Sequence, residues 1–236
     1  MSANPLIIAL DVDSAEHARS LIRQLGQSAG FYKVGPELYA AAGMDFVREL
    51  LDQGKKVFLD LKLYDISETV KRATEQIARV GPTFLTVHAV KPVMRAAMEG
   101  RGKTGLKLLG VTVLTSFDDR DVADLGYDMS LADLITHRVK QCVDLGIDGM
   151  ICSPLEVARV RILAGSRVIL VTPGVRSAGA DAGDQKRVAT PREAMRRGAN
   201  HLVIGREVTR AADPRAACES ILAELARDLV GTPAGL

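Results

Sequence analysis

The sequence predicts a (β/α)₈ barrel, and three observations support this fold class. Eight short apolar segments of strand-like composition are spread along the chain, and segments with a helical period separate them. The length of 236 residues is close to that of a typical barrel of this kind. A doubly wound open sheet is the alternative, but no GxGxxG sequence follows the first predicted strand.

The strands and helices can be placed in chain order. We expect strands at about 6–10, 31–35, 56–61, 83–88, 107–114, 149–152, 167–171 and 201–204. Amphipathic helical segments are clearest at 14–25, 67–79, 130–145 and 191–197. Ser14 can cap the first helix, and Pro191 suits the first turn of a late one. No linker or change in composition divides residues 1–236, so we expect one domain whose last residues, 231–236, fray.

Composition limits the classes of function. Lys and Arg number 31 against 29 Asp and Glu, so the net charge of +2 gives no broad footprint for nucleic acid or an anionic membrane. The apolar run 6–10 is too short for a signal peptide or a spanning helix, and Asp11 and Asp13 end it. The cysteines have no CxxC spacing, which argues against a disulfide framework or a zinc site and favours the cytoplasm: Cys142, Cys152 and Cys218.

The most informative stretch is 57–69, VFLDLKLYDISET. Asp60 and Lys62 are two residues apart on a predicted strand, so both side chains point to the same side. A carboxylate and an ammonium are costly to desolvate there unless they neutralise each other. Asp65 follows on a loop that leads into a helix. The spacing fits a charge network for proton chemistry, and it also fits an ordinary ion pair at a strand end.

Polar residues follow nearly every predicted strand. In a barrel the carboxyl ends of the strands meet at one mouth, where barrel enzymes carry out their chemistry. Strands end where polarity begins, so some polar residues are expected there in any barrel. Charged residues near the ends of the first, second, third, seventh and eighth strands exceed that expectation. The residues at or after the ends of all eight strands are Asp11, Lys33, Asp60, Lys62, His88, Thr115, Ser116, Ser153, Pro173, Gly174, Arg176, Gly205 and Arg206.

The last two strand ends favour a phosphate group. Barrels often bind phosphate with the loops after the seventh and eighth strands, here 172–188 and 204–208. The first loop is rich in Gly, Ala, Ser and Asp, so we expect it to be mobile and able to fold over a ligand. Gly205 lets the backbone approach an anion, and Arg206 can hold phosphate oxygens in a forked contact.

These residues together resemble the orotidine 5′-phosphate decarboxylase family. The family signature is aspartate–x–lysine–x–x–aspartate followed by isoleucine, which matches Asp60, Lys62, Asp65 and Ile66. The supporting segments occur in the same order as in the family: IIALD, YKVGPELY, VTVLTS, TPGVR, the Gln185 of DQKRV, and VIGRE. The resemblance runs from Leu6 to about Arg206.

The resemblance implies decarboxylation of orotidine 5′-phosphate to UMP in pyrimidine synthesis, without a metal or other cofactor. Lys62 would protonate C6 of the pyrimidine, and Asp60 would lie near the substrate carboxylate. Lys33 would belong to the alternating Lys–Asp–Lys–Asp array and, with Asp11, contact the ribose hydroxyls. Asp65 and Thr69 would come from the partner subunit of a homodimer with shared active sites.

The remaining implied roles concern the base and the phosphate. Thr115 and Ser116 would lie by the base, and Ile66 and Pro173 complete the expected substrate contacts. The expected phosphate group comprises Arg176, Gln185, Gly205 and Arg206. His88 would face the mouth, and the pattern assigns it no further role.

The chain departs from the common bacterial motif at three positions. Tyr64 stands where many members carry histidine, and Ser67 and Glu68 stand where they carry Pro-Asn. These positions flank the ionic residues, so we expect altered packing or dimer contacts rather than lost chemistry.

Two other functions fit part of the pattern. A metal-dependent sugar-phosphate decarboxylase, aldolase or epimerase of a related barrel would need further carboxylates, and Asp11 and Glu37 could supply them. That hypothesis leaves Gln185 and the VTVLTS segment unexplained. An inactive nucleotide-binding barrel is the third hypothesis, and the complete charged array argues against it.

Overall fold

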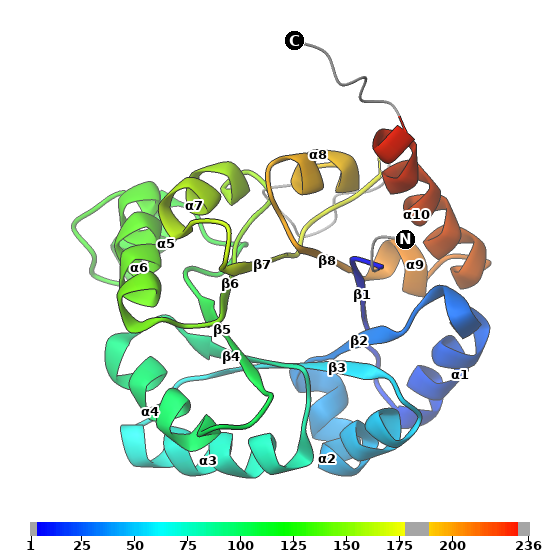
Figure 1. Cartoon of the computed structure of the whole chain (residues 1–236), viewed down its shortest axis with the longest axis horizontal. Coiled ribbons are helices and arrows are strands. Elements are labelled where there is room, and N and C mark those ends of the chain that lie inside the picture. Colours follow the sequence, from blue (N-terminus) through cyan, green and yellow to red (C-terminus); the bar gives the residue numbers. More distant parts are fainter. Residues whose placement is uncertain (1–3, 178–188, 231–236) are drawn as a thin grey trace.

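The computed structural model describes residues 4–177 and 189–230 and confirms the barrel. Eight parallel strands pair in chain order, and β8 pairs with β1 to close the sheet (Figure 1). The strands are β1 (Leu6–Ala9), β2 (Phe31–Val34), β3 (Lys56–Leu63), β4 (Phe84–His88), β5 (Lys107–Val111), β6 (Gly149–Ile151), β7 (Ile169–Thr172) and β8 (His201–Ile204).

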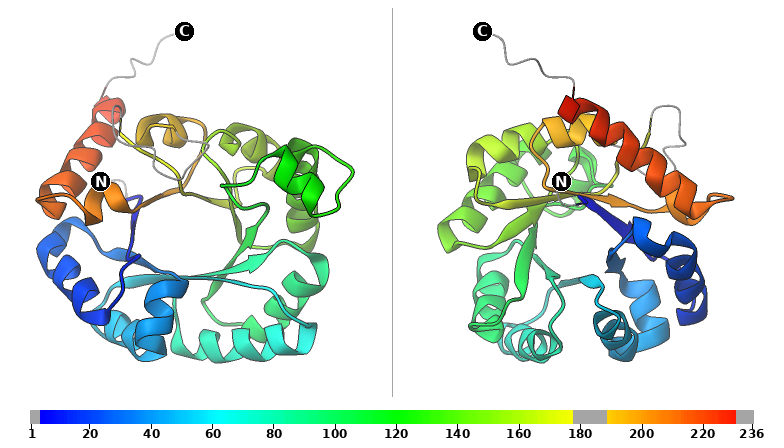
Figure 2. Two further views of the ribbon diagram at one scale, coloured as in Figure 1. Left: turned by 180° about the vertical axis from the view of Figure 1, so that it is seen from behind. Right: turned by 45° about the vertical axis from the view of Figure 1, so that its right-hand side comes forward.

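Helices surround the strands on the outside (Figure 1). They are α1 (Ala15–Leu25), the 3₁₀ turn η1 (Gly26–Ser28), α2 (Pro36–Asp52), α3 (Ser67–Val80), α4 (Lys91–Arg101), α5 (Asp119–Asp124), α6 (Leu131–Leu145), α7 (Val157–Ala164), α8 (Pro191–Arg196), α9 (Arg206–Thr209) and α10 (Pro214–Val230). The last helix contacts α1, α8 and α9, so it completes the ring beside the first helix (Figure 2). None of the helices in the described ranges is long and apolar enough to span a membrane.

The sequence-based boundaries hold best where a cap marks them. The Ser14 side chain accepts a hydrogen bond from the backbone N–H of His17 and starts α1, and Pro191 lies in the first turn of α8. The fifth strand was predicted too long, because β5 ends at Val111 rather than near residue 114. Val113 remains buried after the pairing stops, so the apolar pattern continues past the strand. The expected frayed tail, 231–236, lies outside the described residues.

Two apolar layers make up the core. The inner layer fills the barrel with one or two side chains from each strand: Ile7, Ala9, Phe31, Phe58, Phe84, Leu109, Val111, Ile151, Val171 and Val203. A larger layer lies between the strands and the helices. The barrel interior is therefore packed rather than open, and the polar side chains that follow these residues along the strands lie at the mouth.

The amino-terminal end of the barrel holds a buried histidine among aromatic rings. His201 packs edge-on against Phe31 and Phe84, with ring centroids 5.7 and 5.5 Å away. Its Nδ1 atom has no hydrogen-bond partner in the described part of the chain. Burial lowers the pKa of this imidazole below 6.5, while the carbonyl of Pro5 acts in the opposite direction. His201 therefore fits the structural role that its sequence position indicates.

Replacing His201 with phenylalanine should stabilise the protein, and more so in acid. An unsatisfied buried polar atom costs on the order of 1 kcal/mol, so His201→Phe should gain about that much at pH 7.5. Because the folded-state pKa is lowered, the unfolded chain takes up the proton first, and stability is lost as pH falls below about 6.5. Urea unfolding at pH 7.5 and 5.5 tests this, with His137→Phe on the exposed face of α6 as the control. An equal pH dependence for wild type and His201→Phe would contradict the prediction.

Candidate active site

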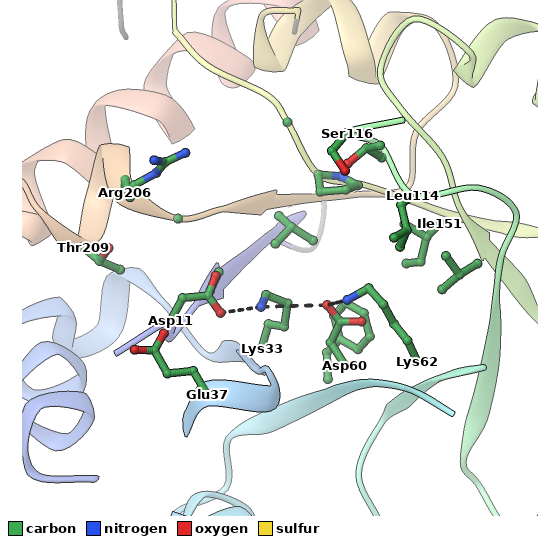
Figure 3. A pocket seen from close by; sticks show the side chains of 18 of the residues that line it. Asp11, Lys33, Glu37, Asp60, Lys62, Leu114, Ser116, Ile151, Arg206 and Thr209 are labelled. Atoms are coloured by element: carbon green, nitrogen blue, oxygen red, sulfur yellow. Dashed lines mark hydrogen bonds and ion pairs between the residues drawn. The ribbon is translucent and has the colours of Figure 1, made fainter. Parts of the chain in front are cut away.

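A cavity of about 480 Å³ opens at the carboxyl ends of the strands (Figure 3). Its apolar lining consists of Ala9, Phe58, Val111, Val113, Leu114, Ile151 and Val203. Its polar and loop lining consists of Asp11, Lys33, Glu37, Asp60, Lys62, Thr115, Ser116, Pro173, Gly174, Arg176, Gly205, Arg206, Thr209 and Arg210. Five basic and three acidic side chains are present, so the cavity carries a formal excess of two positive charges and suits an anionic ligand.

Four of the charged residues form a continuous chain across the floor of the cavity (Figure 3). The Lys33 Nζ atom lies 2.6 Å from Asp11 Oδ1 and 3.9 Å from Asp60 Oδ2. The Lys62 Nζ atom lies 2.9 Å from the same Asp60 Oδ2 atom. The side chains of Lys33 and Asp60 are only 9% and 13% exposed, so these ions attract one another more strongly than a surface pair would. Asp60 is thus shared between two ammonium groups.

Strand register explains why these residues meet. Lys33 is paired with Ala9 on one side and with Phe58 on the other. Side chains alternate along each strand, so Asp60, two residues after Phe58, stays on the inner face at the next level. The predicted placement of Asp60 and Lys62 on one side is confirmed by their contact.

The backbone at Lys62 is unusual. Its φ of 48° makes it the sole non-glycine residue with a positive φ in the described ranges. The register between β3 and β4 shifts between Leu59 and Leu63, so Lys62 lies in a bulge. Bulges re-aim side chains near active sites, and a left-handed non-glycine residue costs about 1–3 kcal/mol of strain. The fold retains this strain at the residue whose ammonium meets Asp60.

Gly35 leaves room for the charged chain. A Cβ atom at this position would lie 2.9 Å from Lys33 Nζ and 3.0 Å from Asp11 Oδ1. Both atoms belong to one short ion pair, so a side chain would have to push that pair apart. The close approach therefore favours glycine where β2 turns into α2.

The loop after β7 is held at both ends beside this cavity. Val175 bridges to Ala189, and the Arg176 N–H donates to the Ala189 carbonyl at 3.0 Å. The Ser177 N–H donates to the carboxylate of Glu207, at 3.3 and 3.2 Å from its two oxygens. These contacts fix Arg176 next to the start of α9, which carries Arg206. The rest of the loop, including the predicted ligand Gln185, lies outside the described residues.

Comparison with known proteins assigns the family. Residues 4–221 match the model of the "Orotidine 5′-phosphate decarboxylase / HUMPS family". The chain belongs to this family.

Named members are similar over nearly the full length. A protein of Rhodopseudomonas palustris (strain HaA2) named orotidine 5′-phosphate decarboxylase is 53% identical over 94% of this chain and 94% of its own. A protein of the same name from Methylorubrum extorquens (strain PA1) is 50% identical over 95% of this chain and 97% of its own. The crystal structure of orotidine 5′-phosphate decarboxylase from Lactobacillus acidophilus superposes with a TM-score of 0.83 at 37% identity, covering 94% of this chain and 99% of that one.

Most of the residues that the family resemblance selects lie at one cavity. The lining includes Asp11, Lys33, Asp60, Lys62, Thr115, Ser116, Pro173, Arg176, Gly205 and Arg206. Asp65, Ile66 and Thr69 do not line it, although they belong to or follow the family motif. All three are exposed, and the Asp65 carboxylate accepts the N–H of Ile66 at 2.7 Å. Within one chain the motif therefore divides into a half inside the cavity and a half outside it.

His88 lies outside the lining as well. Its ring packs on Tyr64, with centroids 5.3 Å apart, so the unusual tyrosine covers the histidine. Burial, with further contributions from the charges of Arg138 and Lys62, lowers the pKa of His88. The neutral imidazole is favoured beside the Lys62 ammonium.

Two residues that line the cavity, and one that lies behind it, are absent from the sequence-based prediction of the site. Thr209 and Arg210 line it three and four positions after Arg206, the spacing at which residues share a helix face. From this spacing, the sequence could have predicted that Thr209 and Arg210 lie on the same side as Arg206. Thr86, which hydrogen-bonds to Asp60 and to the backbone of Lys62, carried no signal because it is an alternating residue within a buried strand.

Proposed function

We propose that this protein decarboxylates orotidine 5′-phosphate to UMP in pyrimidine biosynthesis. The single observation that carries the proposal is the chain of alternating charges, in which Asp60 is held between Lys33 and Lys62. Family membership and the shared name of the close relatives support the same substrate. The free cysteines and the pathway fit a cytoplasmic location.

The chemistry requires a cation at the carbon that loses CO₂. When the bond from C6 to the carboxyl carbon breaks, its electron pair stays on C6 in the plane of the ring, where the π system cannot delocalise it. In this mechanism the Lys62 ammonium stabilises that charge and transfers a proton to C6, becoming a neutral amine that solvent reprotonates. The ammonium is already in place when this charge appears in the transition state. It therefore raises the rate of the chemical step rather than the affinity for the substrate.

The other charged residues position the substrate. Asp60 fixes the Lys62 ammonium at 2.9 Å and would lie next to the substrate carboxylate. Lys33 and Asp11 would contact the ribose hydroxyls. Arg206 and Arg176, which line the same cavity, would hold the phosphate. Contacts remote from C6 orient the ring over Lys62 and can drive loop closure.

A metal-dependent reaction is the second candidate, because Asp11 and Glu37 both line the cavity. Its difficulty is that the Lys33 ammonium lies between Asp11 and Asp60, 2.6 and 3.9 Å from their oxygens. A divalent ion shared by Asp11 and Asp60 would have to displace this buried lysine, and an ion held by Asp11 and Glu37 would compete with the lysine for Asp11. The charge arrangement therefore favours the metal-free decarboxylase.

The purified protein should convert orotidine 5′-phosphate to UMP in the presence of excess EDTA. The conversion is followed by the change in ultraviolet absorbance and by chromatographic identification of UMP. Activity that disappears with EDTA and returns with Mg²⁺ would support the metal-dependent hypothesis instead. Tight binding of UMP without turnover would indicate an inactive nucleotide-binding barrel.

We also propose a homodimer with shared active sites. Tyr64 and Ile66 are 68% and 72% exposed on either side of Asp65, which is unusual for large apolar side chains. A second copy that covers this segment would bury them and bring its Asp65 and Thr69 to the neighbouring cavity. The altered positions Tyr64, Ser67 and Glu68 would then lie at the dimer contact.

A further inference from the structure

We propose that Thr86 is a positioning residue that holds both Asp60 and Lys62 in their reactive arrangement. This inference rests on the proposed decarboxylation. Thr86 lies on β4, is fully buried, and does not line the cavity. It acts through the two charged residues and is not expected to touch the substrate.

The Thr86 hydroxyl makes two hydrogen bonds of opposite direction. It donates to Asp60 Oδ1 at 2.8 Å and accepts the backbone N–H of Lys62 at 2.9 Å. A hydroxyl carries a single hydrogen, so donating it to the carboxylate leaves the oxygen lone pairs for the N–H. Both bonds are made in a buried site, where an unmade hydrogen bond is costly. The hydroxyl thereby connects the side chain of Asp60 to the backbone of Lys62.

The first bond determines which Asp60 oxygen is available to the lysines. Oδ1 is occupied by Thr86, while Oδ2 lies 2.9 Å from Lys62 Nζ and 3.9 Å from Lys33 Nζ. A carboxylate held at one oxygen cannot rotate freely about its terminal torsion. Thr86 therefore presents the other oxygen to the ammonium groups in a fixed direction.

The second bond stabilises the strained backbone. The ladder between β3 and β4 is interrupted from Leu59 to Leu63, and the N–H of Lys62 falls within that gap. Thr86 satisfies this N–H with its side chain. Without the hydroxyl, Lys62 would lose a partner that offsets its positive φ of 48°. The backbone could then relax and carry the ammonium away from Asp60.

The test is the kinetics of Thr86 variants on orotidine 5′-phosphate. Thr86→Val keeps the shape and removes the hydroxyl, and kcat should fall by about 10²-fold, the cost of a displacement near 1 Å. KM should change by less than about threefold, since the phosphate contacts are untouched. Thr86→Ser restores the hydroxyl and should stay within about fivefold of the wild-type kcat. Thr86→Ala also removes the hydroxyl but puts no methyl group in its place beside the Asp60 carboxylate. It should show the same loss of kcat as Thr86→Val.

Thr112 provides a matched control. It is also fully buried, and its hydroxyl donates to the Ile151 carbonyl at 3.3 Å without touching the charged residues. Thr112→Val should therefore lose a buried hydrogen bond while keeping kcat.

Two results would overturn the role of Thr86 while the proposed function stands. One is an equal loss of kcat in Thr86→Val and Thr112→Val. The other is a kcat within threefold of wild type in both Thr86→Val and Thr86→Ala. A wild-type protein that forms no UMP would overturn the proposed function and this inference with it.

Discussion

Replacing Lys62 with alanine should abolish turnover while the protein stays folded. The variant loses the proton donor and the cation that stabilises developing charge at C6. Each of these effects contributes about 10²-fold or more, so we expect kcat to fall by about 10⁴-fold or more. Alanine meets the same backbone strain as lysine at this positive φ, and the lysine side chain is 32% exposed, so the substitution should not unfold the barrel. Turnover is measured by UMP formation, and folding by circular dichroism and thermal unfolding.

Lys62→Arg separates the two contributions of the lysine. Arginine keeps the positive charge beside Asp60 but does not release its proton at accessible pH. If proton transfer from Lys62 is required, this variant should remain at least about 10²-fold below wild type. Lys107→Ala is the control, because Lys107 also pairs with an aspartate, Asp148 at 3.2 Å, but lies at the amino-terminal end of β5. Near-normal turnover of Lys62→Ala would remove Lys62 from the mechanism.

The barrel and the positions of its charged residues could be predicted because they depend on local rules. Apolar runs identify the strands, and the polar residue that follows each run marks its carboxyl end. Once eight such ends converge, Lys33, Asp60 and Arg206 must lie at one mouth. The alternation of side chains along a strand then places Asp60 and Lys62 together.

The geometry that orients these residues could not be read from the sequence. Nothing marks Lys62 as a left-handed residue, because no glycine or asparagine stands there. The bulge depends on the register between β3 and β4, and its partner Thr86 is 24 residues away in the chain. Pairings across strands are set by the closed sheet rather than by local composition. The positioning contacts of the site are therefore visible only in the fold.

The two halves of the motif lie in different places on one chain. Asp65 follows Lys62 by three residues, yet its side chain lies outside the cavity that contains Lys62. It caps the N–H of Ile66 beside two exposed apolar side chains. In a two-fold symmetric dimer each surface patch meets its own copy, so one contact can complete both cavities.

Mixing two inactive variants tests this arrangement directly. Lys62→Ala chains keep Asp65, and Asp65→Asn chains keep Lys62. In a heterodimer one of the two sites then has both residues, one from each chain, and the other has neither. Random exchange of equal amounts makes about half of the dimers mixed, so about a quarter of the wild-type activity should return. Activity is measured after exchange of differently tagged chains has been demonstrated by mass spectrometry.

The control mixture distinguishes shared sites from simple stabilisation. Lys62→Ala mixed with the double variant Lys62→Ala/Asp65→Asn can form the same dimer contacts but no intact site, so it should stay inactive. If each site were built within one chain, neither mixture would recover, because no chain would carry both residues. The absence of recovery in the first mixture, once exchange is shown, would therefore exclude a role for Asp65 in the cavity of the neighbouring subunit. Recovery in the first mixture alone requires that Asp65 act on the cavity of the neighbouring subunit.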